Sequence, residues 1–281
     1  GAEHACMHLL YARFFTKALR DMGYLDFDDP FLSLVHQGTI LGPDGQKMSK
    51  SKGNVISPDD YIKVYGSDTF RMYLMFGFSY VEGGPWSDDG IDAISKFMDR
   101  VERYVRKAKD AVYGDVFGKA EKELDYARNR CIKAMTADMK SFSFNTAIAR
   151  LMEYVNALYK YDSEAEKNTS LVKDCVRDLV LLIAPIAPHF AEELWQCIGG
   201  SYSVFNQRWP VCNEKALVRS EVEIAVQING KIKCKLVVPS GFKGAEGEAL
   251  VLASPDVQKA LEGRAVKKIV IVPDRIANIV V

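Results

Sequence analysis

The feature that most restricts the fold is a change in the spacing of apolar residues at Trp209-Pro210. Before this point, from Ile91 onward, apolar side chains recur every three to four residues, as in amphipathic helices. Beyond it they alternate with polar residues, as in half-buried strands. The sequence therefore predicts a bundle of four helices followed by a sheet. The helical apolar residues are Ile91, Ile94, Met98, Val101, Val105, Ala108 and Val112; Leu124, Ala127, Cys131, Met135 and Met139; Ile148, Leu151, Met152, Val155 and Tyr159; and those from Leu171 to Ile183.

The alternating segment predicts a small α/β domain at the C-terminal end of the chain. It turns back at Asn229-Gly230, a dipeptide typical of two-residue hairpin turns. A helical stretch near residues 246–262 and apolar runs at 267–272 and 276–281 follow. On the returning strand apolar and basic residues alternate, so we expect the basic side chains to share one face. The apolar set is Ile232, Cys234 and Leu236, and the basic set is Lys231, Lys233 and Lys235.

The segment before Ile91 mixes helical and strand patterns. Apolar residues at helical spacing, followed by Gly23, predict one helix over residues 3–22. β-prone residues predict a strand within residues 31–41. Two further helices are expected to begin at Ser57-Pro58 and at Ser67, the first ending at Gly66. The apolar residues of the first helix are Leu9, Ala12, Phe15, Leu19 and Met22.

A glycine-bounded turn at residues 42–45 leads into the string Lys47-Met48-Ser49-Lys50-Ser51, which continues as Lys52-Gly53-Asn54-Val55. Lysine ammonium groups are compact charges with three donors each, suited to a mobile polyphosphate. The serine hydroxyls add short donors, and the glycine lets the backbone turn. From the residues alone, the segment is either a phosphate-binding loop or a solvated, lysine-rich surface turn.

Composition and charge exclude several classes of protein. The chain has 281 residues, 48% apolar and 26% charged, which is an ordinary globular composition with room for two or three domains. Its 37 basic residues equal its 37 acidic ones, so nucleic-acid binding would have to come from local patches. No apolar run approaches the roughly 20 residues of a membrane span. The six scattered cysteines favour free thiols in a reducing cytoplasm.

His4 and His8 lie four residues apart beside Glu3, a spacing that places both imidazoles on one helical face. No third ligand follows at a useful spacing, and the string differs from the His-Glu-x-x-His of zinc proteases. We therefore expect no metal site in the chain.

The string from Lys47 to Asn54 resembles the second signature of the class I aminoacyl-tRNA synthetases. In that family it is a flexible loop that closes over ATP while the aminoacyl-adenylate forms. Gly1-x-Glu3-His4-Ala5, with the segment His8-Leu9-Leu10-Tyr11-Ala12-Arg13-Phe14, resembles the leucyl-tRNA synthetase form of the preceding segment. The resemblance implies that Lys47 and Lys50 stabilise the leaving pyrophosphate and that Ser49 helps to hold the closed loop. It further implies that Gly1, Glu3 and His4 contact the adenosine, and that ATP with Mg²⁺ is the cofactor.

The rest of the chain resembles the same family. The string from Ala184 to Trp195 is similar to one in the anticodon-binding bundles of leucyl, isoleucyl and valyl enzymes. The string Gln227-x-Asn229-Gly230-Lys231 is similar to one in the C-terminal domain of the leucyl enzyme, which grips the outer corner of the tRNA. The resemblance implies a multidomain, mainly α chain. Its expected domains are the end of a Rossmann-type catalytic domain (1–90), an anticodon-binding-type helical bundle (91–215) and a small α/β domain (216–281). The residues expected to contact tRNA(Leu) are Arg103, Arg106, Lys231, Lys233 and Lys235.

The function implied by the resemblance is ATP-dependent ligation of leucine to tRNA(Leu) by a monomeric cytoplasmic enzyme. Gly1 stands inside a helical pattern, and the first signature of the family, His-x-Gly-His, does not occur in the sequence. We therefore expect the chain to be a C-terminal part that does not form leucyl-adenylate by itself. Two alternatives stay open here: a non-catalytic tRNA-binding module that pairs with a separate catalytic subunit, and a fragment of an isoleucyl or valyl enzyme.

Overall fold

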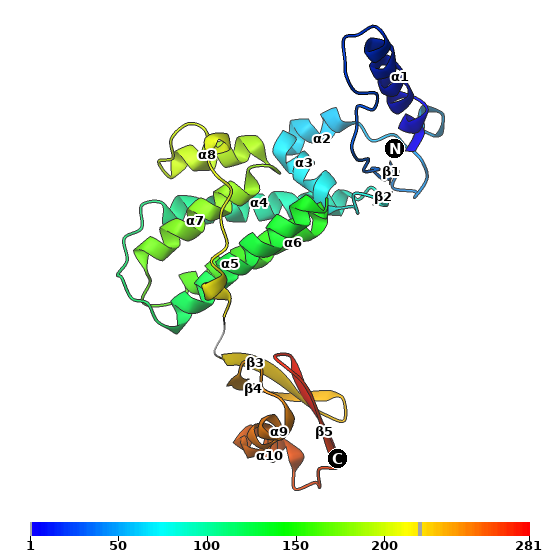
Figure 1. Cartoon of the computed structure of the whole chain (residues 1–281). Coiled ribbons are helices and arrows are strands. Elements are labelled where there is room, and N and C mark those ends of the chain that lie inside the picture. The colour runs from blue at the N-terminus through cyan, green and yellow to red at the C-terminus, as the bar shows by residue number, and fades with distance from the viewer. Residues whose placement is uncertain (1, 219–220) are drawn as a thin grey trace. The chain divides into compact units, whose positions relative to one another are not determined.

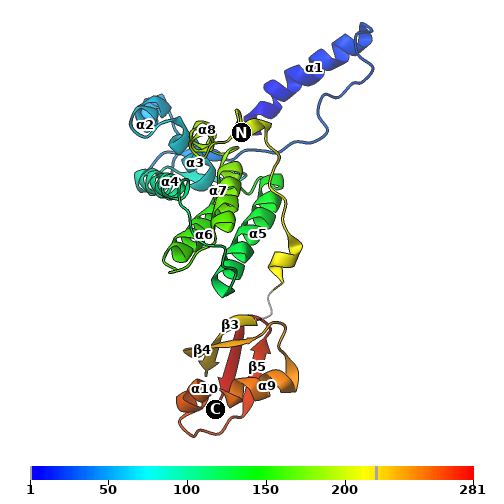
Figure 2. The same cartoon turned by 90° about the vertical axis from the view of Figure 1, so that its left-hand side faces the viewer.

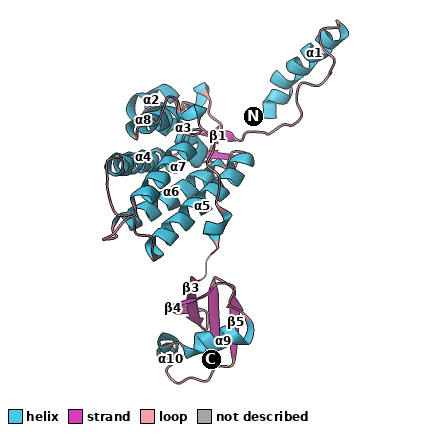
Figure 3. Cartoon of the chain, turned by 60° about the vertical axis from the view of Figure 1, so that its left-hand side comes forward, coloured by secondary structure: helices cyan, strands magenta, loops and turns pink. Residues whose placement is uncertain are grey.

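The computed structural model describes residues 2–218 and 221–281. They form two compact units, Gly1–Asn213 and Glu214–Val281. The first unit is almost entirely helical, whereas a four-stranded sheet dominates the second (Figure 3). The expectation of a mainly helical chain with a small C-terminal sheet domain is confirmed.

The N-terminal part of the first unit carries short elements around a long loop. Two three-residue strands pair in parallel, with Thr39 opposite Gly83 and Leu41 opposite Pro85. Only the last three residues of the strand expected within residues 31–41 form it, because only they find a partner strand for their backbone groups. The elements are the 3₁₀ helix η1 (Ala2–Ala5), α1 (His8–Asp21), β1 (Thr39–Leu41), the 3₁₀ helix η2 (Lys50–Lys52), α2 (Pro58–Tyr65), α3 (Ser67–Phe76) and β2 (Gly83–Pro85).

Helix α1 forms within the predicted range 3–22 but begins only at His8, after the separate 3₁₀ helix η1, and its apolar side is uncovered. Phe15 and Met22, expected to face a core, are 65% and 67% exposed. Thr16 is the one buried residue of the helix. The side chains of Leu10 and Phe14 are also exposed, so α1 presents large apolar groups on more than one side.

The helices α4 to α8 build the body of the first unit (Figure 1). They are α4 (Asp88–Ala108), α5 (Lys119–Lys140), α6 (Phe144–Asp162), α7 (Thr169–Ile183) and α8 (Pro188–Cys197). The short 3₁₀ helix η3 (Val204–Asn206) follows α8. The four predicted amphipathic segments are confirmed, although α4 ends at Ala108 and Val112, expected within it, is 84% exposed.

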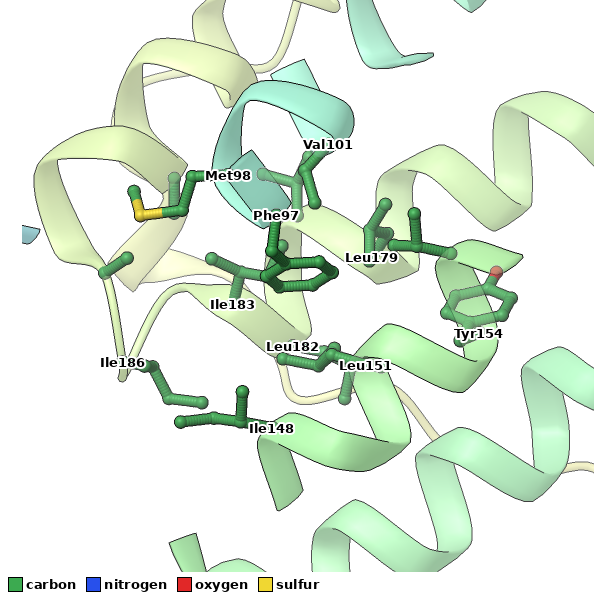
Figure 4. Close-up of a cluster of buried hydrophobic side chains, with 14 of the residues drawn as sticks. Phe97, Met98, Val101, Ile148, Leu151, Tyr154, Leu179, Leu182, Ile183 and Ile186 are labelled. Carbon is green, nitrogen blue, oxygen red and sulfur yellow. The ribbon is translucent and has the colours of Figure 1, made fainter. Parts of the chain in front are cut away.

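Side chains from α4, α6 and α7 fill the centre of this body (Figure 4). Phe97 and Val101 of α4 meet Leu151 of α6 and Leu179 of α7, and all four are at most 4% exposed. The phenol of Tyr154 is buried among them and donates a hydrogen bond to the carbonyl oxygen of Cys175, at 3.0 Å. This buried hydroxyl is therefore satisfied, as a polar group in an apolar core must be. The same core includes Phe70, Met72 and Tyr73 of α3, so residues on both sides of position 90 pack together.

Helix α3 fastens the corner between α7 and α8. Asp68 accepts hydrogen bonds from the backbone N–H of Phe190, at 2.7 Å, and pairs with the ring Nδ1 of His189, at 3.0 Å. One turn further along α3, Arg71 donates to the carbonyl oxygens of Ile186 and Pro185. A carboxylate thus meets the start of α8 and a guanidinium meets the end of α7, the arrangement that both helix dipoles favour. A histidine at such a helix start is expected to pack under the bundle, and for His189 this prediction is wrong: its side chain is 83% exposed.

The cysteines differ in exposure in a way that predicts their reactivity. All six are free; Cys131 and Cys175 are buried, whereas Cys6 is exposed. Burial raises the pKa of each buried thiol to about 12. At pH 8 both thiols are then almost entirely protonated, whereas the thiolate is the reactive form. Under iodoacetamide at pH 8, we expect peptide mass spectrometry to find Cys6 alkylated well before the other two. Equal rates in the native protein would contradict this burial, and urea should equalise them.

The second unit is a four-stranded sheet with two helices on one face (Figure 2). The strand order is β4-β3-β6-β5, with β3 and β6 parallel and the other neighbours antiparallel. The predicted hairpin turn is confirmed, because Asn229 and Gly230 both have positive φ, at 48° and 79°. The elements are the 3₁₀ helix η4 (Glu214–Leu217), β3 (Glu221–Ile228), β4 (Lys231–Pro239), α9 (Gly244–Ala253), α10 (Pro255–Leu261), β5 (Lys268–Val272) and β6 (Ile276–Val280).

Among residues 2–218 and 221–281, the helices are too short or too polar to cross a bilayer.

Candidate functional site

The lysine-rich loop leaves β1 through a tight turn. The backbone N–H of Gly42 donates to the carbonyl oxygen of Gln46, at 2.8 Å, and Leu41 forms an isolated bridge with Lys47. Gly45 has φ of +70°, a conformation that glycine adopts without a Cβ penalty. These contacts place Lys47 directly beside the end of β1, so the loop begins at a fixed position.

Lys47 meets the N-terminal segment. Its Nζ lies 2.6 Å from Oε1 of Glu3, and both side chains are more than half exposed. The hydrogen bond from Lys47 lowers the pKa of Glu3. Two residues that the sequence assigned to one nucleotide site, 44 positions apart, are thus in contact. His4 follows in η1 with an exposed side chain, whereas Gly1 lies outside the described residues.

The second lysine of the string starts a short helix. Lys50 is the first residue of η2 and is exposed. Ser49 precedes it in an extended conformation, and its hydroxyl lies 2.8 Å from that of Ser51. Between the two lysines, Met48 is half-buried and packs against the main core. The thioether therefore anchors the loop while both ammonium groups stay in solvent.

An aromatic cluster carries the strands beneath the loop. Trp86, which follows β2, donates its backbone N–H to Leu41 of β1, at 3.0 Å. Its ring is 4.7 Å from that of Tyr61 in α2 and 4.8 Å from that of Tyr73 in α3, both edge-on. The indole Nε1 donates to Asp88, the first residue of α4, at 2.8 Å. The buried residue Trp86 therefore contacts β1, at the base of the loop, as well as α2, α3 and α4.

The two arginines predicted to contact RNA differ in their surroundings. Arg106 donates to Glu102, at 2.7 Å, and lies 3.5 Å from Glu193. Arg103 is exposed, and within residues 2–218 and 221–281 no acidic side chain pairs with it. The charge of Arg103 is therefore available to a ligand, whereas that of Arg106 is largely compensated inside the chain.

The three lysines of β4 do not share one face, contrary to the prediction. A β-bulge interrupts the pairing between Val226 and Gln227 of β3. Lys231 consequently lies opposite Ile228, whose side chain is buried in the core, while Lys235 lies opposite Ala225 on the other face. Lys233 is the extra residue of the bulge.

The bulge also moves an apolar residue and leaves one lysine paired. Ile232, expected in the core with Cys234 and Leu236, is 64% exposed. Lys235 forms an ion pair with Glu223, at 2.8 Å, and this hydrogen bond raises the pKa of Lys235. All three lysines are exposed, but Lys231 and Lys235 lie on opposite faces of the sheet.

A groove of about 670 Å³ lies along α1. It is lined by apolar residues of the helix and of the segment that follows it, with Arg13, Lys17 and Asp29 at its polar edge. Arg13 and Asp29 form an exposed ion pair across it, at 3.3 Å. In the described part of the chain, no three His, Cys, Asp or Glu side chains are arranged to hold a metal ion.

Sequence reasoning missed two residues of the loop, Asp44 and Asn54. Their side chains bond to each other and to the loop backbone. Two local signals could have found them: the aspartate of a Pro-Asp-Gly turn, which commonly bonds its own backbone two residues on, and an asparagine directly after a glycine.

Comparison with known proteins agrees with this arrangement. The family model for tRNA synthetases class I (I, L, M and V) matches residues 12–84, and that for the anticodon-binding domain of tRNA ligase matches residues 121–247. The whole chain aligns with leucine–tRNA ligases of Clostridium kluyveri, at 58% identity, and of Caldanaerobacter subterraneus subsp. tengcongensis, at 59%. It spans 35% of the length of each of these curated relatives.

Solved structures give the same result. The agnB2 LeuRS of Agrobacterium radiobacter K84, crystallised in a ternary complex with tRNA and LeuAMS, is 35% identical, with a TM-score of 0.74 over 100% of this chain and 36% of that chain. Methionyl-tRNA synthetase of Mycobacterium tuberculosis, at 18% identity, has a TM-score of 0.53 over 59% of this chain and 38% of its own, which shows a shared fold.

The lysine loop on its paired strands, followed by the helical body, defines a class I aminoacyl-tRNA synthetase, and the chain belongs to that family. Within the family it corresponds to the C-terminal portion of leucine–tRNA ligases, with the end of the catalytic domain and the anticodon-binding domain.

Proposed function

We propose that the chain supplies the ATP loop and the tRNA-binding parts of an enzyme that ligates leucine to tRNA(Leu). The observation that carries this proposal is the contact between Lys47 and Glu3, at 2.6 Å. It unites two motif segments, distant in sequence, at the place where the nucleotide is expected. The alignment of the whole of this chain with leucine–tRNA ligases supports leucine rather than isoleucine or valine as the amino acid.

In this proposal the work of the site is the positioning of charge. Lys47 and Lys50 stabilise the negative charge that develops on the departing pyrophosphate, as fixed cations do in phosphoryl-group chemistry. Ser49 holds the loop, and Gly1, Glu3 and His4 contact the adenosine. Mg²⁺ fits only as a companion of ATP, because the described residues offer no ligand cluster of their own and this ion is commonly bound through substrate phosphates.

The tRNA-binding proposal concerns two parts of the chain. Arg103, with its uncompensated charge, and Arg106 would contact phosphates beside the helical body, and Lys231, Lys233 and Lys235 would do so from the second unit. We propose functional boundaries at 1–90, 91–215 and 216–281, and a monomeric enzyme of the cytoplasm, where its free cysteines stay reduced. Because the chain spans about a third of its relatives, adenylate formation is assigned to the longer enzyme.

Binding of the chain to purified leucine, valine and isoleucine tRNAs across a salt series tests this function. We expect tight binding to leucine tRNA that weakens with salt. Reversing Lys231, Lys233 and Lys235 to glutamate should weaken it about tenfold at low salt. The same change should flatten the salt dependence, because each phosphate that is no longer neutralised reduces the logarithmic slope by roughly 0.7 to 0.9.

A matched triple reversal separates local contact from total charge. Lys243, Lys259 and Lys267 are exposed and lie in the same unit, so their change to glutamate alters the net charge equally. This control should keep most of the affinity. If it weakens binding as much as the β4 reversal, or if the three tRNAs bind alike, the assigned contacts are wrong. If no tRNA binds, the tRNA-binding role of this chain is wrong.

A further inference from the structure

The side chain of Asn54 lies across the lysine loop and bonds to both of its limbs. Its Oδ1 accepts the backbone N–H of Ser49, at 2.9 Å. Its Nδ2 donates to both carboxylate oxygens of Asp44, at 3.2 and 3.1 Å, and to the carbonyl oxygen of Lys47, at 3.4 Å. Asp44 in turn accepts the backbone N–H of Gln46, at 3.0 Å. We refer to this pair of side chains as the Asp44–Asn54 clasp.

The partners fix the orientation of the amide. A carboxylate only accepts hydrogen bonds and a backbone N–H only donates them, so Nδ2 must face Asp44 and Oδ1 must face Ser49. Hydrogen bonds from Gln46 and Asn54 lower the pKa of Asp44, in keeping with an ionised carboxylate that accepts both of them. The clasp therefore has one stable arrangement of donors and acceptors.

Gly42 leaves room for the clasp, and Gly53 forms the turn beside it. A Cβ on Gly42 would lie 2.7 Å from Oδ1 of Asp44 and 3.0 Å from Nδ2 of Asn54. Gly53 has φ of +67° and turns the chain directly before Asn54. The clasp therefore favours glycine at both positions. Gly42 has no side chain to collide with the clasp, and Gly53 adopts a backbone conformation that residues with a Cβ rarely adopt.

We propose that the Asp44–Asn54 clasp positions Lys47 for a polyphosphate ligand. Asn54 holds the carbonyl of Lys47 and the N–H of Ser49, the two backbone groups that flank Met48, so it sets the direction in which the lysine leaves the loop. The clasp stays closed when ligand binds, and the exposed Lys47–Glu3 ion pair is the contact that a phosphate group replaces. Asp44 and Asn54 are positioning residues. This inference rests on the proposed function of the loop.

The clasp can be tested by variants in which its carboxylate and its amide swap positions. Asn54→Asp places two carboxylates against each other and breaks the clasp. Adding Asp44→Asn restores one carboxylate and one amide in swapped positions, so the two side chains can bond to each other again and accept the N–H groups of Gln46 and Ser49. The hydrogen bond to the carbonyl oxygen of Lys47 is not restored, because an aspartate at position 54 has no donor. In the complete chain, amide exchange followed by NMR should accelerate on the order of tenfold at Gln46 and Ser49 in Asn54→Asp and return toward the original rate in the double variant.

The positioning role is read from binding of inorganic pyrophosphate to the same three proteins. Asn54→Asp should weaken it about tenfold, and the double variant should recover only part of the loss, because the carbonyl oxygen of Lys47 still lacks its donor there. Gln37→Glu, which adds the same negative charge at an exposed residue before β1, should alter neither readout.

The amide-exchange and pyrophosphate-binding results test the clasp and its positioning role separately. Unchanged exchange in Asn54→Asp, or a double variant no better than the single one, overturns the clasp. Exchange that follows the swap while pyrophosphate binding is unchanged overturns its positioning role. If the unaltered chain binds no pyrophosphate although the exchange data follow the swap, the phosphate-binding function of the loop and the role built on it are both wrong.

Discussion

Replacing Asp178 by alanine is expected to lower the free energy of unfolding of the helical unit by about 3–5 kcal/mol. The carboxylate of Asp178 in α7 is only 4% exposed and lies 2.7 Å from Nε of Arg128 in α5. Removing it leaves a guanidinium that is 16% exposed without its closest counter-charge. Urea denaturation followed by helical circular dichroism measures the loss, as a lower midpoint with an unchanged slope.

Two further variants show whether burial of the pair is the cause. Asp174 approaches the same arginine, at 3.8 Å, but is 46% exposed, so Asp174→Ala should cost less than about 1 kcal/mol. The double change Arg128→Met with Asp178→Leu removes both charges and should be much more stable than Asp178→Ala. Equal losses for Asp174→Ala and Asp178→Ala would show that the buried pair has no special role.

This network also marks where sequence reasoning about the fold ends. The apolar stripes predicted the helices because each stripe carries its own period: Ile148, Leu151 and Val155 define the buried side of α6 without help from other segments. A buried aspartate within α7 has no such signature. Its partner is 50 residues away and is found only when α5 and α7 pack together.

Predictions about the site likewise depended on whether the signal is local in the sequence. The lysine loop was predictable because its glycines, lysines and hydroxyls are consecutive in the chain. The family resemblance assigned Glu3 and Lys47 to one nucleotide site but did not predict their ion pair, since no local rule connects residues 44 positions apart. The prediction of a single lysine face on β4 was wrong because strict alternation cannot reveal an extra residue, and Lys233 is that residue. The apolar side of α1 was predicted, but not that it would be left uncovered.

Replacing Gly83 by alanine is expected to separate β1 from β2 and release the base of the lysine loop. A Cβ at this position would lie 2.1 Å from the carbonyl oxygen of Thr39, and Gly83 has φ of +75°. The left-handed conformation alone costs an L-residue roughly 1–2 kcal/mol, and a backbone clash of this size adds more because neither strand can move without losing its pairing. The backbone N–H of Trp86, bonded to Leu41, should then exchange with solvent on the order of a hundredfold faster.

Two other glycines divide this effect into its causes. A Cβ at Gly38 would lie 2.1 Å from the backbone nitrogen of Gly83, without a positive φ, so Gly38→Ala tests the clash. Gly45 has φ of +70° and open space around it, so Gly45→Ala tests conformation alone. We expect Gly38→Ala to approach Gly83→Ala in effect and Gly45→Ala to leave Trp86 protected. The opposite order would mean that backbone conformation, and not the close backbone approach at Gly38 and Gly83, holds the loop in place.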